Sequence, residues 1–163
     1  MREAVIVEVV RTPIGRKNGY LKNVRPDDLT GYVMKELVQR AKIDPALIED
    51  VILGCVSQVG EQAGDIARVA ALIAGLPVEV PGVTIDRQCG SSQQAVHFAA
   101  QAIISGDMDI VIAGGVESMS RIPMGSNYLG VKPSERLTSS YEIVHQGVSA
   151  ERIAQKYNLT RED

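Results

Sequence analysis

Four runs of apolar, largely β-branched residues recur along the first 115 positions, and stretches with helical signals separate them. Short runs of nearly continuous apolarity are typical of strands that are buried on both faces of a parallel sheet. The alternation of such strands with helices predicts an α/β fold with a largely parallel sheet. The predicted strands cover residues 4–10, 49–56, 82–88 and 109–115.

The intervening segments carry the start and stop signals of helices. Pro26, Asp27 and Asp28 open the first helix, where proline and acidic side chains are favoured. Gly75 and Gly106 follow the second and third helices, and glycine readily ends a helix. The predicted helices span residues 26–42, 65–74 and 90–105.

Residues 118–147 are rich in Pro, Gly, Ser and Asn and have no sustained periodicity. They predict an extended loop, which in a compact chain is usually functional or an insertion. A capped amphipathic helix is expected at 148–157 with Ser149 as its N-cap, and Thr160 begins another helix. Because only the start of this last helix is present, we expect the chain to be truncated.

Charge and cysteine content narrow the classes of function. A net charge of -3 without a basic face argues against nucleic-acid binding. Two cysteines without metal-ligand spacing predict neither a disulfide framework nor a metal site, and they favour a reducing, cytoplasmic location. The N-terminal apolar run is too short to span a membrane and does not resemble a signal peptide. We therefore expect no metal, no membrane and no nucleic-acid partner.

Cys89 stands at the predicted junction between the strand 82–88 and the helix 90–105. Open α/β sheets bind ligands at this edge, and a helix N-terminus favours a thiolate. The small residues 90–92 (GSS) would let a thioester approach the sulfur. The position suits an acyl-transfer nucleophile, but it also suits a small buried side chain at a helix start. Cys55 lies within a predicted strand, and we expect it to be structural.

Four segments in register resemble the thiolase family across essentially the whole chain. Each is a weak signal alone, but their shared order and spacing are specific, and together they favour catalysis by Cys89. The segments are residues 9–15 (VVRTPIG), 64–68 (GDIAR) leading to 74–77 (AGLP), 86–92 (DRQCGSS) and 113–120 (AGGVESMS).

The resemblance implies an acyl-CoA acyltransferase in which Cys89 carries the acyl group. Its thiolate would attack the 3-keto carbon of a 3-oxoacyl-CoA, release acetyl-CoA or a related thioester, and pass the acyl group to CoA. The reverse reaction is a Claisen condensation. The backbone N–H of Cys89 would form part of the oxyanion hole. Coenzyme A would be a substrate or product, with no covalently bound cofactor.

The resemblance also implies the fold, namely the N-terminal half of a thiolase. We expect a mixed, mostly parallel five-stranded sheet with helices on both faces, formed by residues 1–117, followed at 118–163 by the start of a loop domain that helps bind CoA. The intact protein would be a homodimer or homotetramer. The histidine and second cysteine that the family uses for proton transfer have no counterpart here, so we expect this chain alone to be inactive.

His145, Gln146 and Gly147 are candidate substrate-binding residues. The family usually has a Met-Gly pair at this point, and that Met lines the acyl pocket. Gln146 replaces it, which puts the usual short-chain preference in doubt. The alternative is an ordinary junction between a loop and a helix. His97, inside the helix 90–105, is expected to be a structural or surface histidine.

Glu117 follows the glycine pair 114–115, which lacks the lysine and the spacing of a P-loop. We expect close backbone packing there, with Glu117 buried and hydrogen-bonded. Arg68 is expected to be a structural or subunit-contact arginine, with a surface ion pair as the alternative. Two other functions remain open: a 3-oxoacyl synthase-type condensing enzyme, and a non-catalytic half-thiolase scaffold.

Overall fold

The computed structural model describes residues 2–163. The chain forms two compact units, of which the first ends at Asn127 and the second spans Tyr128–Asp163. The division of the chain into a core at 1–117 and a loop domain at 118–163 stays a prediction.

A three-stranded parallel sheet lies at the centre of the first unit. Its strands are β1 (Asp50–Gly54), β2 (Gly82–Ile85) and β3 (Val111–Gly115), in the order β2-β1-β3. The α/β class and the parallel pairing of these strands are therefore confirmed. The sheet has three strands within residues 2–163, where the sequence predicted five.

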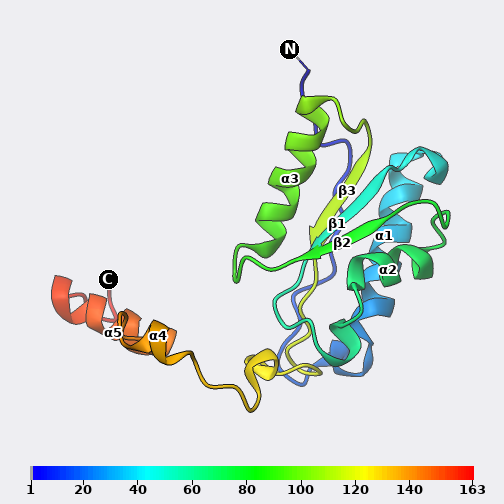
Figure 1. Cartoon of the computed structure of the whole chain (residues 1–163). Helices are drawn as coiled ribbons and strands as arrows, with labels where there is room; N and C mark the ends of the chain where they lie inside the picture. Colours follow the sequence, from blue (N-terminus) through cyan, green and yellow to red (C-terminus); the bar gives the residue numbers. More distant parts are fainter. Residues whose placement is uncertain (1) are drawn as a thin grey trace. The chain divides into compact units, whose positions relative to one another are not determined.

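Helices cover both faces of this sheet, as predicted (Figure 1). Helix α3 (Ser91–Ser105) lies on one face, and α1 (Pro26–Ala41) and α2 (Ile66–Ala74) lie on the other. Gly75 and Gly106 end α2 and α3 in the left-handed region, with φ of 84° and 88°, which explains why glycine stands there. Short 3-10 turns connect these elements: η1 (Tyr20–Asn23), η2 (Pro45–Leu47) and η3 (Gly60–Gln62).

The core depends on small residues that let helices approach the sheet closely. On one face, Ala67, Ala70 and Ala71 of α2 are fully buried against a cluster that includes Val51 and Leu53 of β1. On the other face, Ala95 and Ala99 of α3 pack on Ile52. The central strand is thereby buried on both sides, as its continuous apolarity predicted.

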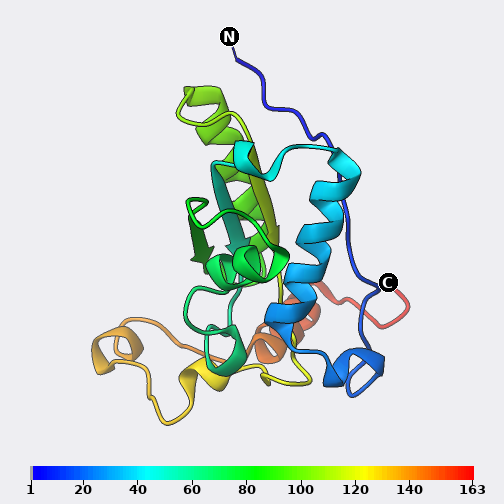
Figure 2. The same cartoon turned by 90° about the vertical axis from the view of Figure 1, so that its right-hand side faces the viewer.

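The predicted strand at residues 4–10 is wrong. These residues are extended but belong to no strand, and Val5, Ile6, Val7 and Val9 are each 68–76% exposed. A cavity of about 590 Å³ lies between this segment and β3, so their backbones do not form a ladder. Figure 2 shows the segment in dark blue, apart from the arrows of the sheet. Apolarity predicts that a segment can become a strand, but a strand also requires a partner edge within hydrogen-bonding distance.

The second unit contains α4 (Glu135–Thr138) and α5 (Gln146–Tyr157), and the turn η4 (Ser126–Tyr128) spans the boundary between the units. The region 118–147 is thus mostly irregular, as predicted, but it includes α4 and η4. Helix α5 begins before residue 148, and its N-cap is His145 instead of Ser149. No helix begins at Thr160 within the described residues, because Asn158 ends α5 with φ of 53°. No helix among residues 2–163 is long and apolar enough to cross a membrane.

Candidate active site

Cys89 lies in the short connection between the end of β2 at Ile85 and the start of α3 at Ser91. Its side chain is exposed, and the neighbouring Gly90 is the N-cap residue of α3. No side chain caps this helix end, so its first N–H groups and its partial positive charge face the connection. Cys89 is therefore an accessible thiol beside a helix N-terminus at the carboxyl edge of a parallel sheet.

The turn that carries Cys89 contains a left-handed residue, Gln88, with φ of 48°. A residue with a Cβ atom rarely adopts this conformation unless its surroundings hold it there. The carboxylate of Asp86 accepts a hydrogen bond of 2.7 Å from the N–H of Gln88. The hydroxyl of Ser91 accepts one of 2.8 Å from the N–H of Arg87 and donates one of 2.6 Å to the carbonyl of Gln88.

The backbone N–H of Cys89 differs from its neighbours because it makes no hydrogen bond within residues 2–163. The N–H of Gly90 donates to the Arg87 carbonyl, and the N–H of Ser91 donates to the Gln88 carbonyl, both at 3.0 Å. Within this turn, the N–H of Cys89 is thus the donor left available to an acceptor on a bound substrate.

The second cysteine has the opposite environment. Cys55 directly follows β1 and is 1% exposed. Burial raises the pKa of its thiol to about 12, and the nearby charges of Glu117 and Asp86 add to this effect. Cys55 is consequently a buried, protonated thiol at neutral pH, in agreement with the structural role expected from its place in the sequence.

The loops around the site are tied together by Glu117. Its carboxylate accepts hydrogen bonds from the N–H groups of Val56 and Ser57 at 2.8 and 3.3 Å, and from the amide of Gln62 at 2.9 Å. The fully buried Gln62 also bonds the carbonyl of Ser57 and the N–H of Ser118. Glu117 was predicted to be buried and hydrogen-bonded; the hydrogen bonds are confirmed, but the prediction of burial is wrong, because the residue is exposed.

Gln62 was not singled out from the sequence. A lone glutamine in a short turn carries no signal of burial, and its partners lie in the loops that follow β1 and β3. Only the folded chain brings these loops together. Gln62 and Glu117 thereby fix the backbone at the carboxyl ends of two strands, the edge at which Cys89 also lies.

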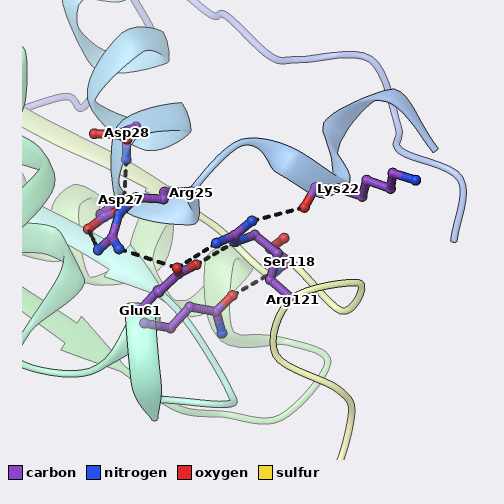
Figure 3. A network of polar contacts seen from close by, with 8 residues as sticks. Lys22, Arg25, Asp27, Asp28, Glu61, Ser118 and Arg121 are labelled. Carbon is purple, nitrogen blue, oxygen red and sulfur yellow. Dashed lines mark hydrogen bonds and ion pairs between the residues drawn. The ribbon is translucent and has the colours of Figure 1, made fainter. Parts of the chain in front are cut away.

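An ion-pair network holds the adjoining segments in place (Figure 3). The carboxylate of Glu61 pairs with Arg121 at 2.5 Å and with Arg25 at 3.2 Å, and Arg25 also pairs with Asp27 at 2.6 Å. The hydrogen bonds from Arg121 lower the pKa of Glu61. At Asp27, burial would raise the pKa, but the hydrogen bonds from Arg25 and the backbone outweigh it, so the pKa is lowered. Sequence reasoning did not identify this network, because Glu61 lies 36 positions from Arg25 and 60 positions from Arg121 along the chain.

The other residues singled out from the sequence have local contacts. The guanidinium of Arg68 donates to the carbonyls of Val78 and Val80, which is a structural role within the loop before β2. His97 is exposed on α3, as expected of a surface histidine. Among residues 2–163, no group of three or more His, Cys, Asp or Glu side chains could hold a metal ion.

His145, Gln146 and Gly147 lie in the second unit at the start of α5, and all three are exposed. The Nδ1 atom of His145 accepts a hydrogen bond of 3.1 Å from the N–H of Gly147. This contact makes His145 the N-cap of α5. The substrate-binding role of the three residues stays a prediction.

Comparisons with known proteins extend over the whole chain. Residues 4–163 match the family model of the thiolase N-terminal domain. A steroid 3-ketoacyl-CoA thiolase of Mycobacterium tuberculosis is 46% identical over all of this chain and 43% of its own length. A 3-oxoadipyl-CoA/3-oxo-5,6-dehydrosuberyl-CoA thiolase of Escherichia coli is 55% identical over 76% of this chain and 31% of its own length.

The fold also matches a solved structure. The crystal structure of the Bacillus anthracis acetyl-CoA acetyltransferase has a TM-score of 0.80 and 37% identity, over 99% of this chain and 44% of that chain. The chain therefore spans less than half the length of the proteins that it resembles.

Proposed function

This chain belongs to the thiolase family, and we propose that the protein containing it is an acyl-CoA acyltransferase with Cys89 as the acyl-carrying nucleophile. The observation that carries the proposal is the position of Cys89. It is an exposed thiol beside the N-terminus of α3, and its own backbone N–H makes no hydrogen bond within residues 2–163. A nucleophile and an oxyanion donor thus come from the same residue.

The proposed chemistry has two steps. The Cys89 thiolate attacks the 3-keto carbon of a 3-oxoacyl-CoA, and the carbonyl electrons move to the oxygen, which the Cys89 N–H stabilises. When the carbonyl re-forms, the bond between C2 and C3 breaks, and its electron pair and a proton yield acetyl-CoA or a related thioester. The thiolate of free CoA then attacks the acyl-enzyme and expels the Cys89 thiolate. Because a thiolate is both a nucleophile and a leaving group, one cysteine serves both steps.

Coenzyme A enters this scheme as a substrate and leaves as part of a product, and no covalently bound cofactor is invoked. We propose the degradative direction with bulky 3-oxoacyl groups. The names of two relatives specify steroid and 3-oxoadipyl thioesters, and residue 146 is Gln where the family usually has Met. His145, Gln146 and Gly147 would contribute to the acyl pocket, and residues 118–163 would begin the loop domain that binds CoA.

The proposal extends to the setting of the protein. Free cysteines, one buried and one exposed, suit a reducing, cytoplasmic location. The exposed side chains of Val96 and Phe98 on α3, at 41% and 39%, support burial of this surface in the intact homodimer or homotetramer. Acyl-CoA and CoA are the proposed partners, and no membrane or nucleic acid is included.

The experiment that tests the function is trapping of the acyl-enzyme. The natural gene product that contains these residues is mixed in parallel with acetoacetyl-CoA and with 3-oxoadipyl-CoA, the substrate class named for one relative, then digested under acidic conditions and mapped by mass spectrometry. We expect an acyl thioester on Cys89, acetyl from the first substrate or succinyl from the second, its disappearance when CoA is added, and its absence in Cys89→Ser. Cys89 left unmodified by both substrates would refute the thiolase proposal and favour a non-catalytic half-thiolase scaffold. Acyl transfer to a carrier-protein thiol but not to CoA would favour a 3-oxoacyl synthase.

A further inference from the structure

The hydroxyl of Ser91 is the side-chain group that joins the two residues before Cys89 to the first residue of α3. Ser91 is 5% exposed, and its hydroxyl accepts from the N–H of Arg87 and donates to the carbonyl of Gln88. A hydroxyl has one proton to donate, and here that proton is committed to the Gln88 carbonyl. The hydroxyl of Ser91 is therefore not available to a substrate, because both of its hydrogen bonds are made to the turn.

These contacts hold the turn in a conformation that it would not adopt by itself. Gln88 lies in the left-handed region, and its carbonyl receives two hydrogen bonds, one from the hydroxyl and one from the N–H of Ser91. Asp86 fixes the N–H of the same residue. With Gln88 held on both sides, the peptide plane that carries the N–H of Cys89 has a defined direction.

The helix end itself has no freedom to shift toward the sheet. A Cβ atom placed on Gly54 would lie 2.3 Å from the carbonyl carbon of Ser91, and one placed on Gly115 would lie 2.6 Å from the Cβ of Ser92. The backbone at the start of α3 thus packs against the ends of β1 and β3. Because the hydroxyl of Ser91 is hydrogen-bonded to Arg87 and Gln88, this packing also determines the backbone conformation of the turn before Cys89.

We propose that Ser91 is a positioning residue that aims the backbone N–H of Cys89 at the oxyanion formed during acyl transfer. This inference rests on the proposed function, because it assigns a role within the same site. It predicts that loss of the hydroxyl impairs reactions that pass through an oxyanion more than reactions of the same sulfur that do not.

Two reactions of Cys89 separate these cases. Acylation by acetoacetyl-CoA passes through a tetrahedral oxyanion, whereas alkylation by iodoacetamide is a direct displacement at carbon without one. In the natural gene product, we expect Ser91→Ala to slow acylation by about 10-fold or more, since loss of one oxyanion donor costs about 100- to 1,000-fold and misalignment costs part of that. Alkylation should stay within about 3-fold of the wild-type rate.

Ser105→Ala is the matched control. Ser105 is the last residue of α3, far from Cys89 along the helix, and it is exposed; its hydroxyl donates to the carbonyl of Ala102 or to the carboxylate of Asp107. Both of its rates should remain at the wild-type level. Circular dichroism confirms that each variant is folded, and Ser91→Cys, which keeps the size of the side chain but replaces the hydroxyl by a weakly hydrogen-bonding thiol, provides a second measurement if Ser91→Ala unfolds.

The outcomes distinguish failure of the proposed function from failure of the role proposed for Ser91. If wild-type Cys89 is not acylated, the proposed function fails. If wild-type Cys89 is acylated and folded Ser91→Ala is acylated equally fast, the function stands and the role of Ser91 is refuted. A parallel loss of acylation and alkylation would also refute it, because that result indicates a general disturbance of the turn. If Ser91→Ala unfolds, acylation at the wild-type rate in folded Ser91→Cys would refute the role too, because a thiol is a much weaker hydrogen-bond partner than a hydroxyl.

Discussion

Gly54 at the end of β1 lies directly against Ser91 at the start of α3. A Cβ atom added to Gly54 would lie 2.3 Å from the carbonyl carbon of Ser91. The contact places the N-terminus of α3, and with it the turn of Cys89, directly on the carboxyl edge of the sheet. A methyl group added at position 54 should therefore displace the start of α3 and disturb the site, although it would not contact Cys89 itself.

We expect Gly54→Ala to destabilise the protein by about 1–3 kcal/mol, because overpacking of a close backbone contact forces α3 to shift. Acylation of Cys89 should fall as well. Urea unfolding and the trapping experiment measure the two effects. Gly114→Ala is the control, since its Cβ would meet only Leu53 Cδ2 at 3.5 Å, an ordinary contact. Equal stability of the two variants would contradict the tight seating of α3.

The two cysteines should differ sharply in reactivity. We expect iodoacetamide at neutral pH to modify Cys89 and to leave Cys55 unmodified until the protein is denatured. Cys89 is exposed, whereas Cys55 is 1% exposed and burial raises the pKa of its thiol to about 12. Peptide mapping against time gives both rates, and Cys89→Ser shows the behaviour of Cys55 alone. Modification of both cysteines at the same rate would exclude this account of the site.

The ion-pair network should make stability depend on pH in the acid range. The pKa values of Asp27 and Glu61 are lowered from 3.8 and 4.5, so both carboxylates contribute stability above these values. That contribution is lost as the pH falls further, because the unfolded chain binds the protons first. We expect the free energy of unfolding to decrease below about pH 4.5, and Arg121→Met to make this decrease shallower.

Arg152→Met is the control for the network. Arg152 also pairs with a glutamate, Glu142, but both side chains are more than half exposed, whereas Arg121 and Glu61 are about one quarter exposed. Exposed pairs contribute little to stability. The pH dependence of urea unfolding should therefore change in Arg121→Met and remain in Arg152→Met; the reverse result would show that the network does not couple to folding.

Gln62 should be essential for stability despite being an uncharged residue in a short turn. Gln62→Leu fills nearly the same volume but leaves the N–H of Ser118 and the carbonyl of Ser57 without their partner. Each buried group left unsatisfied costs about 1–3 kcal/mol. Thermal and urea unfolding measure the loss. Gln58→Leu is the control, because Gln58 is exposed and donates only to the carbonyl of Cys55. A stable Gln62→Leu would show that water replaces these bonds.

Much of the fold could be predicted because its signals are local. Gly75 and Gly106 end helices in a left-handed conformation that favours glycine, and this preference is readable in any sequence. The continuous apolarity of residues 50–54 likewise identifies a strand that is covered on both faces. The place of Cys89 between a strand and a helix followed from the same local patterns.

Tertiary structure decided the features that depend on distant partners. Residues 4–10 have the composition of a strand but lie across a cavity from β3, and composition does not specify which edge a segment will reach. The same is true of Gln62, whose burial depends on loops after two different strands. By itself, the sequence determined the family, the class of fold and the cysteine that can act as nucleophile, since each of these rests on short segments and on their order along the chain. The direction in which the N–H of Cys89 points was decided only when Gly54 allowed Ser91 to seat against the sheet.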